Sequence, residues 1–331
     1  MTFPRIFLAT FLVLFGAIGV AAIWKKPKAP EQSQSANAAV VQSAPIEISL
    51  TSLQEKSKPV EVVTPVQATA QSKPQLPDVD NIELLFQKNS GLPIVETVRY
   101  KSQVPWKRSR SAWLVDYASH YKTHLHFIAR SLNGKRDYTP KAAREGDSFN
   151  VLSQTENFYF YLLVDISRCK MWFYYVRPEQ NERFLLKTYR VGLGRVDTSR
   201  ASGCLTPTGT YKLGSRVAVF QPKMMGNHKG QRVELIRVFG TRWIPFEKEI
   251  KDCSEPAKSY GIHGTPWQAE AGTDRLVDNP TSVGNYESDG CIRLAQNDIE
   301  ELFAIISTHD TIIEIVSEFE KAKQNSFDNK D

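Results

Sequence analysis

One cysteine of the chain stands in a setting that suits a reactive thiol. In "NYESDGCIRLAQND", Cys291 follows Gly290, with Asp289 two places before it and Arg293 two places after it. A structural cysteine needs no charged neighbours, and such charges make burial costly. Glycine lets a substrate approach the backbone closely and leaves adjacent N–H groups able to face a developing oxyanion. The pattern therefore favours a nucleophilic thiol that a substrate must reach.

A thiol nucleophile needs a base that withdraws its proton, and histidine is the usual one. Of the six histidines, His263 in "YGIHGTPW" is expected at the end of a strand, where small neighbours suit a cleft. Three others, His120, His124 and His126, are expected on or beside a helix. His120 and His124 have the helical spacing of metal ligands, but no third ligand is near, so a solvated helix face is favoured. We predict that His263 and Cys291 act together, without a metal.

The remaining cysteines are Cys169, Cys204 and Cys253, and no Cys-x-x-Cys motif is present. A zinc ribbon or a thioredoxin-like redox site is therefore not expected. If Cys291 stays free, the other three allow at most one disulfide in an exported protein.

The N-terminus predicts export. Residues 6–24 carry no charge, and this length just spans a bilayer. We interpret residues 1–24 as an export signal that stays as a membrane anchor, with cleavage as the alternative. Residues 25–80 lack Gly, Cys and aromatic residues and are rich in Pro, Ala, Gln, Ser and Lys. Such a segment cannot offset its ordering entropy by burial and is predicted to be a disordered linker.

Residues 81–153 are predicted to form a small α+β subdomain. Apolar side chains recur at helical spacing, which predicts one amphipathic helix carrying Trp113, Tyr117, Tyr121, Leu125 and Ile128. A turn-rich segment and the strand "SFNVL" follow. The combination "FIARSLN … REGDSFNVL" resembles a LysM-type half-motif, which would bind the cell wall. The alternative is a supporting subdomain.

Residues 154–317 are predicted to be mainly β, and residues 318–331 a polar tail. Short β-rich runs are "NFYFYLLVD", "KMWFYYV", "RFLLKTYRVGLG", "GTYKLGS", "RVELIRVFG", "SYGIHG" and "TIIEIV". One helix, "NDIEELFAIIS", is expected late in this region, starting at its Asn/Asp pair. Many strands and one late helix favour a β sandwich or barrel over alternating βαβ units.

The overall composition is that of a globular protein, with 41% hydrophobic and 24% charged residues in a chain of 331. The net charge of +6 is mildly basic. No dense Lys/Arg block interleaved with aromatic residues occurs, so nucleic acid is not an expected partner. Mild basicity is compatible with an anionic membrane or wall polymer.

"YGIHGTPW" followed by "SDGCIRL" resembles the signature of the L,D-transpeptidase (YkuD-type) family. "LLVDISRCKMWFYYV", "TYRVGLGR" and "TPTGTYKLGS" resemble the opening strands and the Thr-Pro-x-Gly-x turn of that domain, in the same order. The resemblance covers residues 155–317. It implies a β-sandwich-like fold, a periplasmic or cell-envelope location, peptidoglycan stem peptides as substrates, and no cofactor.

The resemblance also implies roles for catalytic residues. Cys291 would be the nucleophile, and His263 would be the general base and later the general acid. The backbone carbonyl of Gly264 would orient the His263 ring by accepting from its second nitrogen. Gly290 would help to form the oxyanion site.

Substrate contacts follow in the same way. Arg293 would steady the loop or a substrate carboxylate, a task that suits a bidentate guanidinium. Ser288 would shape the turn and the oxyanion site, and Tyr260 is a further candidate for binding substrate.

The implied reaction is acyl transfer. The thiolate attacks the carbonyl on the L-centre of diaminopimelate in a tetrapeptide stem and expels D-Ala. The diaminopimelate amine of a second stem then resolves the thioester and forms a 3-3 cross-link. Two alternatives stay open: water resolves the thioester, giving an L,D-carboxypeptidase or another hydrolase, or the chain is an inert peptidoglycan-binding protein. The presence of both His263 and Cys291 argues against inertness.

Two features depart from the family pattern. Asp289 stands beside the nucleophile, where an acid is expected to raise the pKa of the thiol. The segment between His263 and Cys291 is long, and "EAGTDRLVDNPTSVGN" is interpreted as an enlarged lid that controls access to the site.

Overall fold

The structure is a computed structural model that describes residues 76–133 and 143–322. The predicted export segment, the linker up to residue 75 and the tail beyond residue 322 lie outside the described residues. Within the described ranges, no helix has the length and apolar character needed to cross a membrane.

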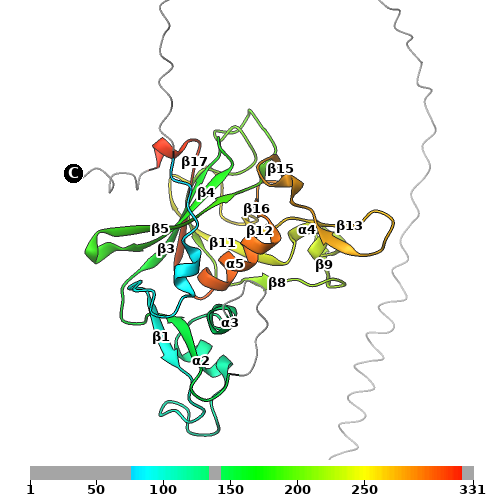
Figure 1. The fold of residues 1–331 in the computed structure, drawn as a ribbon. Helices are drawn as coiled ribbons and strands as arrows, with labels where there is room; N and C mark the ends of the chain where they lie inside the picture. The colour runs from blue at the N-terminus through cyan, green and yellow to red at the C-terminus, as the bar shows by residue number, and fades with distance from the viewer. Residues whose placement is uncertain (1–75, 134–142, 323–331) are drawn as a thin grey trace, which may run out of the picture. The chain divides into compact units, whose positions relative to one another are not determined.

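The central feature is a mixed sheet of nine strands (Figure 1). Its order is β16-β12-β11-β7-β17-β3-β4-β5, and β8 pairs with β11. These strands are β3 (Tyr159–Asp165), β4 (Lys170–Arg177), β5 (Glu182–Arg190), β7 (Gly209–Leu213), β8 (Ala218–Val219), β11 (Arg242–Lys251), β12 (Gly261–Gly264), β16 (Ile292–Leu294) and β17 (Thr311–Val316). The prediction of a mainly β fold is confirmed. Instead of two stacked sheets, the strands form one sheet that curls into a half-barrel.

The remaining elements form pairs and short helices around this sheet. The two-stranded pairs are β1 (Val95–Arg99) with β2 (Ser148–Leu152), β6 (Leu193–Gly194) with β15 (Tyr286–Ser288), β9 (Met225–His228) with β10 (Gln231–Glu234), and β13 (Trp267–Ala269) with β14 (Leu276–Asp278). The helices are α2 (Leu114–His120), α3 (Leu125–Asn133), α4 (Ile236–Phe239) and α5 (Gln296–Ile306). Turns of 3-10 helix cover Ile82–Leu85, Pro178–Gln180, Pro280–Ser282 and Phe319–Lys321.

The strands at the centre of the sheet follow directly from their composition. β3 and β4 are nearly continuous apolar runs, and almost every residue of both is buried. A strand that is covered on both faces shows this pattern instead of alternation. In the described structure these strands lie between β17 and β5, where neither can be an edge.

The predicted single helix over residues 113–128 is wrong. The chain forms α2 and α3, and between them Lys122 adopts a left-handed backbone conformation with a φ of 47°. Such a conformation cannot continue a helix. Tyr117 and Ile128 are buried as expected, but Trp113 precedes α2 and is 60% exposed.

Two further predictions need correction. "RVELIRVFG" is not one strand, because its first part belongs to β10 and its second part forms α4. The strand β11 was not predicted at all, although it has ten residues. It contains Pro245 and a run of charged residues, which sequence reasoning treats as signs against a central strand.

Helix α5 begins at Gln296, one residue before the predicted Asn/Asp start, and its capping residue is Ala295. Alanine has no side chain that can accept from the first N–H groups. Instead, Asp278 Oδ2 accepts from Gln296 N at 3.3 Å, and its other oxygen accepts from the Thr265 hydroxyl. A residue distant in sequence therefore ties the start of α5 to the end of β12.

Part of the predicted linker lies against the sheet. Val79 O accepts from Thr188 N at 2.9 Å, and Pro77 O accepts from the Trp172 indole at 2.7 Å. Just beyond this stretch, Ile82 and Leu85 are fully buried in the main core. Residues 76–80, which were assigned to the linker, thus run along β5.

A buried charged cluster joins the small subdomain to the sheet. Glu301 of α5 is 4% exposed and accepts from Arg130 Nη1 at 2.8 Å, Lys187 Nζ at 2.6 Å and Tyr189 OH at 3.2 Å. Arg130 belongs to α3, and Lys187 belongs to β5. Buried charges must be paired, and Glu301 is the acid that the two cations share. Arg130 also pairs with Glu83, and Lys187 also lies within 3.4 Å of Asp80 and Asp298.

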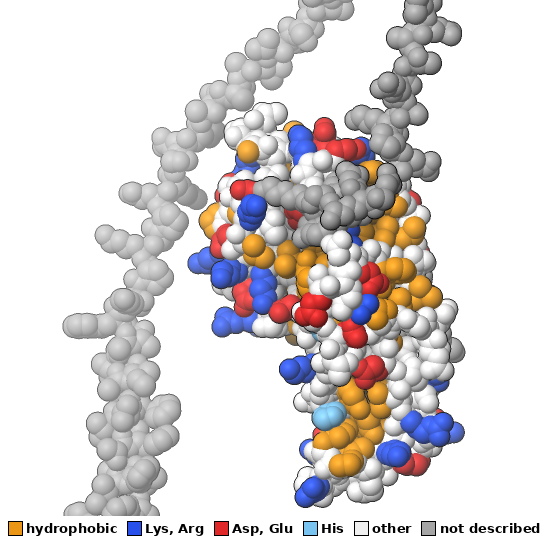
Figure 2. All heavy atoms as spheres, turned by 90° about the vertical axis from the view of Figure 1, so that its left-hand side faces the viewer, with side chains coloured by type: hydrophobic (Ala, Val, Ile, Leu, Met, Phe, Trp, Pro, Cys, Tyr) orange, Lys and Arg blue, Asp and Glu red, His pale blue; other side chains and the backbone are white. Residues whose placement is uncertain are grey.

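On the face drawn in Figure 2, basic and acidic side chains are intermixed with hydrophobic ones. That face therefore shows no large patch of purely positive or purely negative charge, in spite of the net charge of +6.

We predict that Glu301→Ala lowers the free energy of unfolding by about 1–3 kcal/mol, because two buried cations lose their shared partner while Arg130 keeps Glu83 and Lys187 keeps Asp80 and Asp298. Urea denaturation followed by circular dichroism measures this change. The control is Asp310→Ala, which removes a surface pair with Lys212 and should cost less than about 1 kcal/mol. Equal decreases in the free energy of unfolding in the two variants would contradict a stabilising role of the buried cluster.

Candidate active site

The site is built on three adjacent strands of the sheet. His263 of β12 lies opposite Trp243 of β11 and opposite Arg293 of β16. Because side chains alternate along a strand, these three share one face. The intervening positions, Ile244, Ile262 and Ile292, are at most 1% exposed and belong to the core on the other face.

Cys291 immediately precedes β16, and one residue, Ile292, separates it from Arg293, so it shares the face of His263. Both residues line one cleft of about 800 Å³. The cleft is also lined by His228, Lys229, Val238, Phe239, Trp243, Glu255, Pro256, Lys258, Ser259, Tyr260, Ser288, Asp289 and Arg293. The structure therefore brings the predicted nucleophile and base together.

The orientation of His263 is fixed by its own strand. Nδ1 lies 2.7 Å from the Gly264 carbonyl oxygen, which can only accept, so Nδ1 must carry the proton. This tautomer leaves Nε2 without a proton. Burial lowers the pKa of His263 to about 4; the Gly264 carbonyl opposes this effect, whereas the charge of Arg293 adds to it. The imidazole is neutral at pH 7.

The thiol of Cys291 is also neutral at rest. Burial raises its pKa to about 11, a backbone interaction with Gly261 and the charge of Arg293 oppose the rise, and Asp289 adds to it. Its Sγ lies 3.8 Å from the Ser259 carbonyl oxygen, which is the acceptor found for the thiol within the described residues. At rest the sulfur therefore carries its proton.

Asp289 does not act on the thiol as an isolated charge. It pairs with Arg195 at 2.6 Å and with Lys229, and these cations hold the pKa of the Asp289 carboxyl below its usual value. Lys229 stands at the turn between β9 and β10, so the pair fastens this hairpin to the loop that carries Cys291. Burial, not Asp289, is the main cause of the raised thiol pKa.

The turn before Cys291 is held by its own hydrogen bonds. Ser288 Oγ donates to the Cys291 carbonyl oxygen at 2.6 Å and accepts from Gly290 N at 3.1 Å. Ser288 is 1% exposed, so its hydroxyl shapes the loop and does not face a substrate. The N–H of Gly290 is likewise engaged, which leaves the N–H of Cys291 as the candidate oxyanion donor.

Glycine is required at position 290. Its φ is 118°, and a Cβ there would lie 2.6 Å from Tyr260 Cε1 and 2.7 Å from the Leu205 carbonyl oxygen. Any side chain would push the Tyr260 ring out of the cleft wall or unfold the turn.

The site lies in a region of the chain that matches a known protein family. Residues 159–315 match the family model of the L,D-transpeptidase catalytic domain, YkuD. Over these residues the chain is similar to the catalytic domain of that family.

Two curated relatives carry the name "Putative L,D-transpeptidase YkuD". The protein of Bacillus licheniformis is 30% identical over 122 residues, which are 37% of this chain and 48% of the relative. The protein of Bacillus subtilis is 29% identical over 122 residues, with 37% of this chain and 49% of the relative covered. The chain thus spans about half the length of the curated relatives it matches.

Solved structures are similar over part of the chain. The helical cell shape determining protein Pgp2 from Campylobacter jejuni is 17% identical, with 51% of each chain covered and a TM-score of 0.32. L,D-transpeptidase 3 from Mycobacterium tuberculosis is 11% identical, with 52% of this chain and 76% of that chain covered and a TM-score of 0.27.

Arg293 and Tyr260 both line the cleft that holds Cys291 and His263. The backbone of Arg293 exchanges hydrogen bonds with Gly192, each 2.8 Å long. Its Nε is buried and has no hydrogen-bond partner among the described residues. The residue is therefore fixed through its backbone, and its charge lowers the pKa of both Cys291 and His263.

The predicted lid is not at the cleft that holds Cys291 and His263. "EAGTDRLVDNPTSVGN" includes β14 and the Pro280–Ser282 turn, and none of its residues lines the cleft. The hairpin β9–β10 contributes His228 and Lys229 instead. Sequence reasoning missed these two residues because their contacts are long-range: Lys229 pairs with Asp289, and His228 packs edge-on against Phe239.

All four cysteines are free, so no disulfide forms between Cys169, Cys204 and Cys253.

His120 and His124, which have the helical spacing of metal ligands, lie in different surroundings. His120 stacks on Trp106, and His124 packs against Phe303. Within residues 76–133 and 143–322, no group of three or more potential metal ligands occurs.

We predict that alkylation of Cys291 by iodoacetamide accelerates about tenfold per pH unit from pH 7 to pH 9, because the thiolate fraction rises below a pKa of about 11. Mass spectrometry of the Cys291 peptide measures the rate. A plateau below pH 8 would show a thiolate at rest and contradict the neutral pair.

The same assay tests the surrounding charges. Lys229→Met should slow alkylation at pH 8 by a few-fold, because it removes a charge that lowers the thiol pKa and releases Asp289. Cys291→Ala gives the background from the half-buried Cys253. An unchanged or faster rate in Lys229→Met would show that the ion pair has no electrostatic effect on the thiol.

Proposed function

We propose that the chain is a cysteine acyltransferase that acts on peptidoglycan stem peptides in the cell envelope. The observation that carries this proposal is the shared cleft of Cys291 and His263, with His263 held in the tautomer that leaves Nε2 free to accept a proton. The family match over residues 159–315 supports the substrate class.

The first step forms a thioester. Cys291 transfers its proton to His263 Nε2 as its sulfur attacks the carbonyl on the L-centre of diaminopimelate in a tetrapeptide stem. The N–H of Cys291 faces the oxyanion of the tetrahedral intermediate. When the C–N bond breaks, His263 gives the proton to the nitrogen of the departing D-Ala.

The second step regenerates the thiol. The diaminopimelate amine of a neighbouring stem loses a proton to His263 and attacks the thioester carbonyl. The sulfur leaves and recovers that proton, and a 3-3 cross-link is formed. The neutral His263 is suited to both steps, because a protonated imidazole could not accept from either nucleophile.

The walls of the cleft suit an anionic peptide. Lys229, Lys258 and Arg293 line it together with two acids, Glu255 and Asp289, and Asp289 is paired with Lys229. Stem peptides carry carboxylates, which these cations attract. Apolar contacts come from Phe239 and Trp243, which pack against the His263 ring at 5.5 Å and 5.8 Å between centroids.

The N-terminal residues complete the proposal. Residues 6–24 would anchor the chain in the inner membrane, and residues 25–75 would lift the catalytic domain toward the wall. The subdomain of β1, α2, α3 and β2 would bind the wall in the manner of a LysM-type module.

We predict that Cys291→Ala abolishes D-Ala release from tetrapeptide stems, because the thioester cannot form. His263→Gln should lower the release rate at least about a hundredfold, since general base catalysis is lost. Purified sacculi are incubated with each variant, and D-Ala and muropeptides are quantified by chromatography and mass spectrometry. The control is Cys253→Ala, which removes a cysteine away from the cleft.

The muropeptides distinguish the alternatives. New 3-3 dimers support the transferase, whereas tripeptides alone would identify an L,D-carboxypeptidase. Sacculus binding without D-Ala release in the unmodified chain would identify an inert binding protein and overturn the proposal.

A further inference from the structure

A second cavity lies behind the strand that supports the active site. It measures about 530 Å³ and is formed where α3, β11, β13 and α5 meet. Its lining residues are His124, Leu125, His126, Val219, Phe220, Gln221, Pro222, Ile236, Thr241, Arg242, Trp267 and Glu300. Arg242 adjoins Trp243 in β11, so alternation along the strand puts this cavity on the opposite face from the catalytic cleft.

The polar groups of this cavity include buried donors that the protein does not use. Thr241 is 6% exposed and Arg242 is 9% exposed. The Thr241 hydroxyl, Arg242 Nε and the Trp267 indole N–H have no hydrogen-bond partner among the described residues. Buried donors are normally satisfied, and an unmade bond costs free energy, so several of them around one cavity indicate a missing acceptor.

The guanidinium of Arg242 is only partly neutralised. Its Nη1 donates to the Thr241 carbonyl oxygen at 2.9 Å and lies 3.8 Å from Glu300 Oε1. Glu300 also accepts from Gln296 Nε2 at 3.3 Å. Arg242 Nε has no hydrogen-bond partner among the described residues. The guanidinium edge that contains Nε has the fork geometry that matches the two oxygens of a carboxylate.

His124 adds a further donor. Its Nδ1 accepts from His126 N at 3.2 Å, so the neutral ring carries its proton on Nε2. Burial, together with the charges of His126 and Arg242, lowers the pKa of His124 to about 4 and keeps the ring neutral at pH 7. The ring therefore donates without adding a positive charge.

We propose that this cavity binds the C-terminal carboxylate of a short peptide with small side chains. Arg242 holds the carboxylate, and the Thr241 hydroxyl and Trp267 indole donate to its oxygens and to the preceding carbonyl. Leu125, Phe220, Pro222 and Ile236 form the apolar wall for the side chains. The volume lies in the range of ordinary ligand pockets and admits about two residues.

The position of the cavity gives this binding a structural effect. Its walls come from α3 of the small subdomain and from the strand that lies beside β12. A peptide bound there contacts both parts at once and stabilises their junction. Nothing in this site depends on Cys291.

The test is calorimetric titration of the full chain with N-acetyl-alanyl-alanine and with its C-terminal amide. The free acid should bind, and the amide should bind at least about tenfold more weakly, because the charge-assisted bond is lost. Absence of binding up to millimolar peptide, or equal affinity for acid and amide, would overturn the proposal.

Two nearly isosteric variants assign the site. Thr241→Val and Trp267→Phe each remove a donor that has no partner in the protein, so neither should lower the melting temperature of the free chain. Each should weaken peptide binding several-fold, and Arg242→Lys about tenfold. Binding that survives all three changes would place the peptide elsewhere and refute the assignment.

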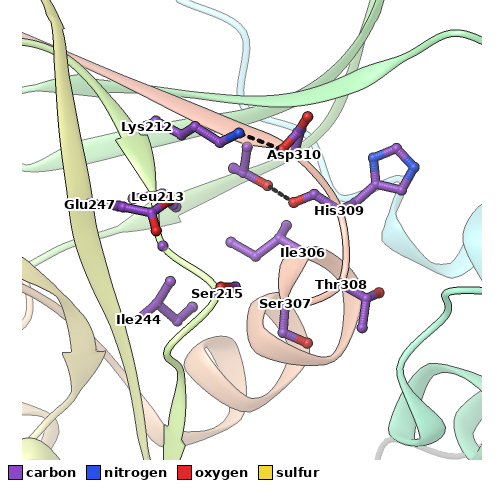
Figure 3. Close-up of a pocket in the computed structure, with 12 residues that line it drawn as sticks. Lys212, Leu213, Ser215, Ile244, Glu247, Ile306, Ser307, Thr308, His309 and Asp310 are labelled. Atoms are coloured by element: carbon purple, nitrogen blue, oxygen red, sulfur yellow. Dashed lines mark hydrogen bonds and ion pairs between the residues drawn. The ribbon is translucent and has the colours of Figure 1, made fainter. Parts of the chain in front are cut away.

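The matched control is Ser307→Ala. The Ser307 hydroxyl is also buried without a partner, but it lines another cavity of about 260 Å³ at the turn between α5 and β17 (Figure 3). There, Lys212 is already paired with Asp310 at 2.8 Å. This variant should bind the peptide as the unmodified chain does. Cys291→Ala should also retain peptide binding while losing D-Ala release, which separates the two sites.

Discussion

The pairing of β12 with its two neighbours is the constraint on which the site depends. Its register sets His263 between Trp243 and Arg293 on the cleft face, while Ile262 lies between two other isoleucines in the core. A shift by one residue would exchange the two faces, turning His263 into the isoleucine core and Ile262 toward the cleft. The register is therefore enforced by the cost of exposing the isoleucine layer, and catalysis gains its geometry from core packing.

Helix α5 supports this strand from behind. Gly264 approaches the helix so closely that a Cβ there would lie 3.3 Å from Ile299 Cγ2. Asp278 holds the first turn of the helix, and Glu301 joins its middle to Arg130 and Lys187. The small subdomain, the sheet and the base of the active site are thus connected through one helix. Both polar anchors come from segments remote in sequence.

Local composition predicted the features that depend on local chemistry. His263 and Cys291 were found because glycines surround them and the two motifs occur in a family order. The strands β3, β4 and β17 were predicted from their apolar runs, because a strand that is buried on both faces has a nearly continuous apolar sequence. Pro245 concealed β11: its missing N–H is tolerated there, and its carbonyl oxygen accepts from Gly214 N at 2.8 Å.

Other features depend on partners that no local pattern reveals. The start of α5 is capped by Asp278, whose position is set by hairpin β13–β14. The loop of Cys291 is fastened to hairpin β9–β10 through Asp289, whose effect on the thiol cannot be judged without Arg195 and Lys229. In each case the ion pair or hydrogen bond forms only after the chain has folded.

The neutral state of Cys291 has a consequence for its stability toward oxidants. Peroxides and disulfides react with thiolates far faster than with thiols, and oxidised cysteine can pass irreversibly to sulfinic acid. A cysteine with a pKa of about 11 exposes almost no thiolate while the cleft is empty. The half-buried thiol is thereby protected from oxidants as long as nothing in the cleft draws its proton away.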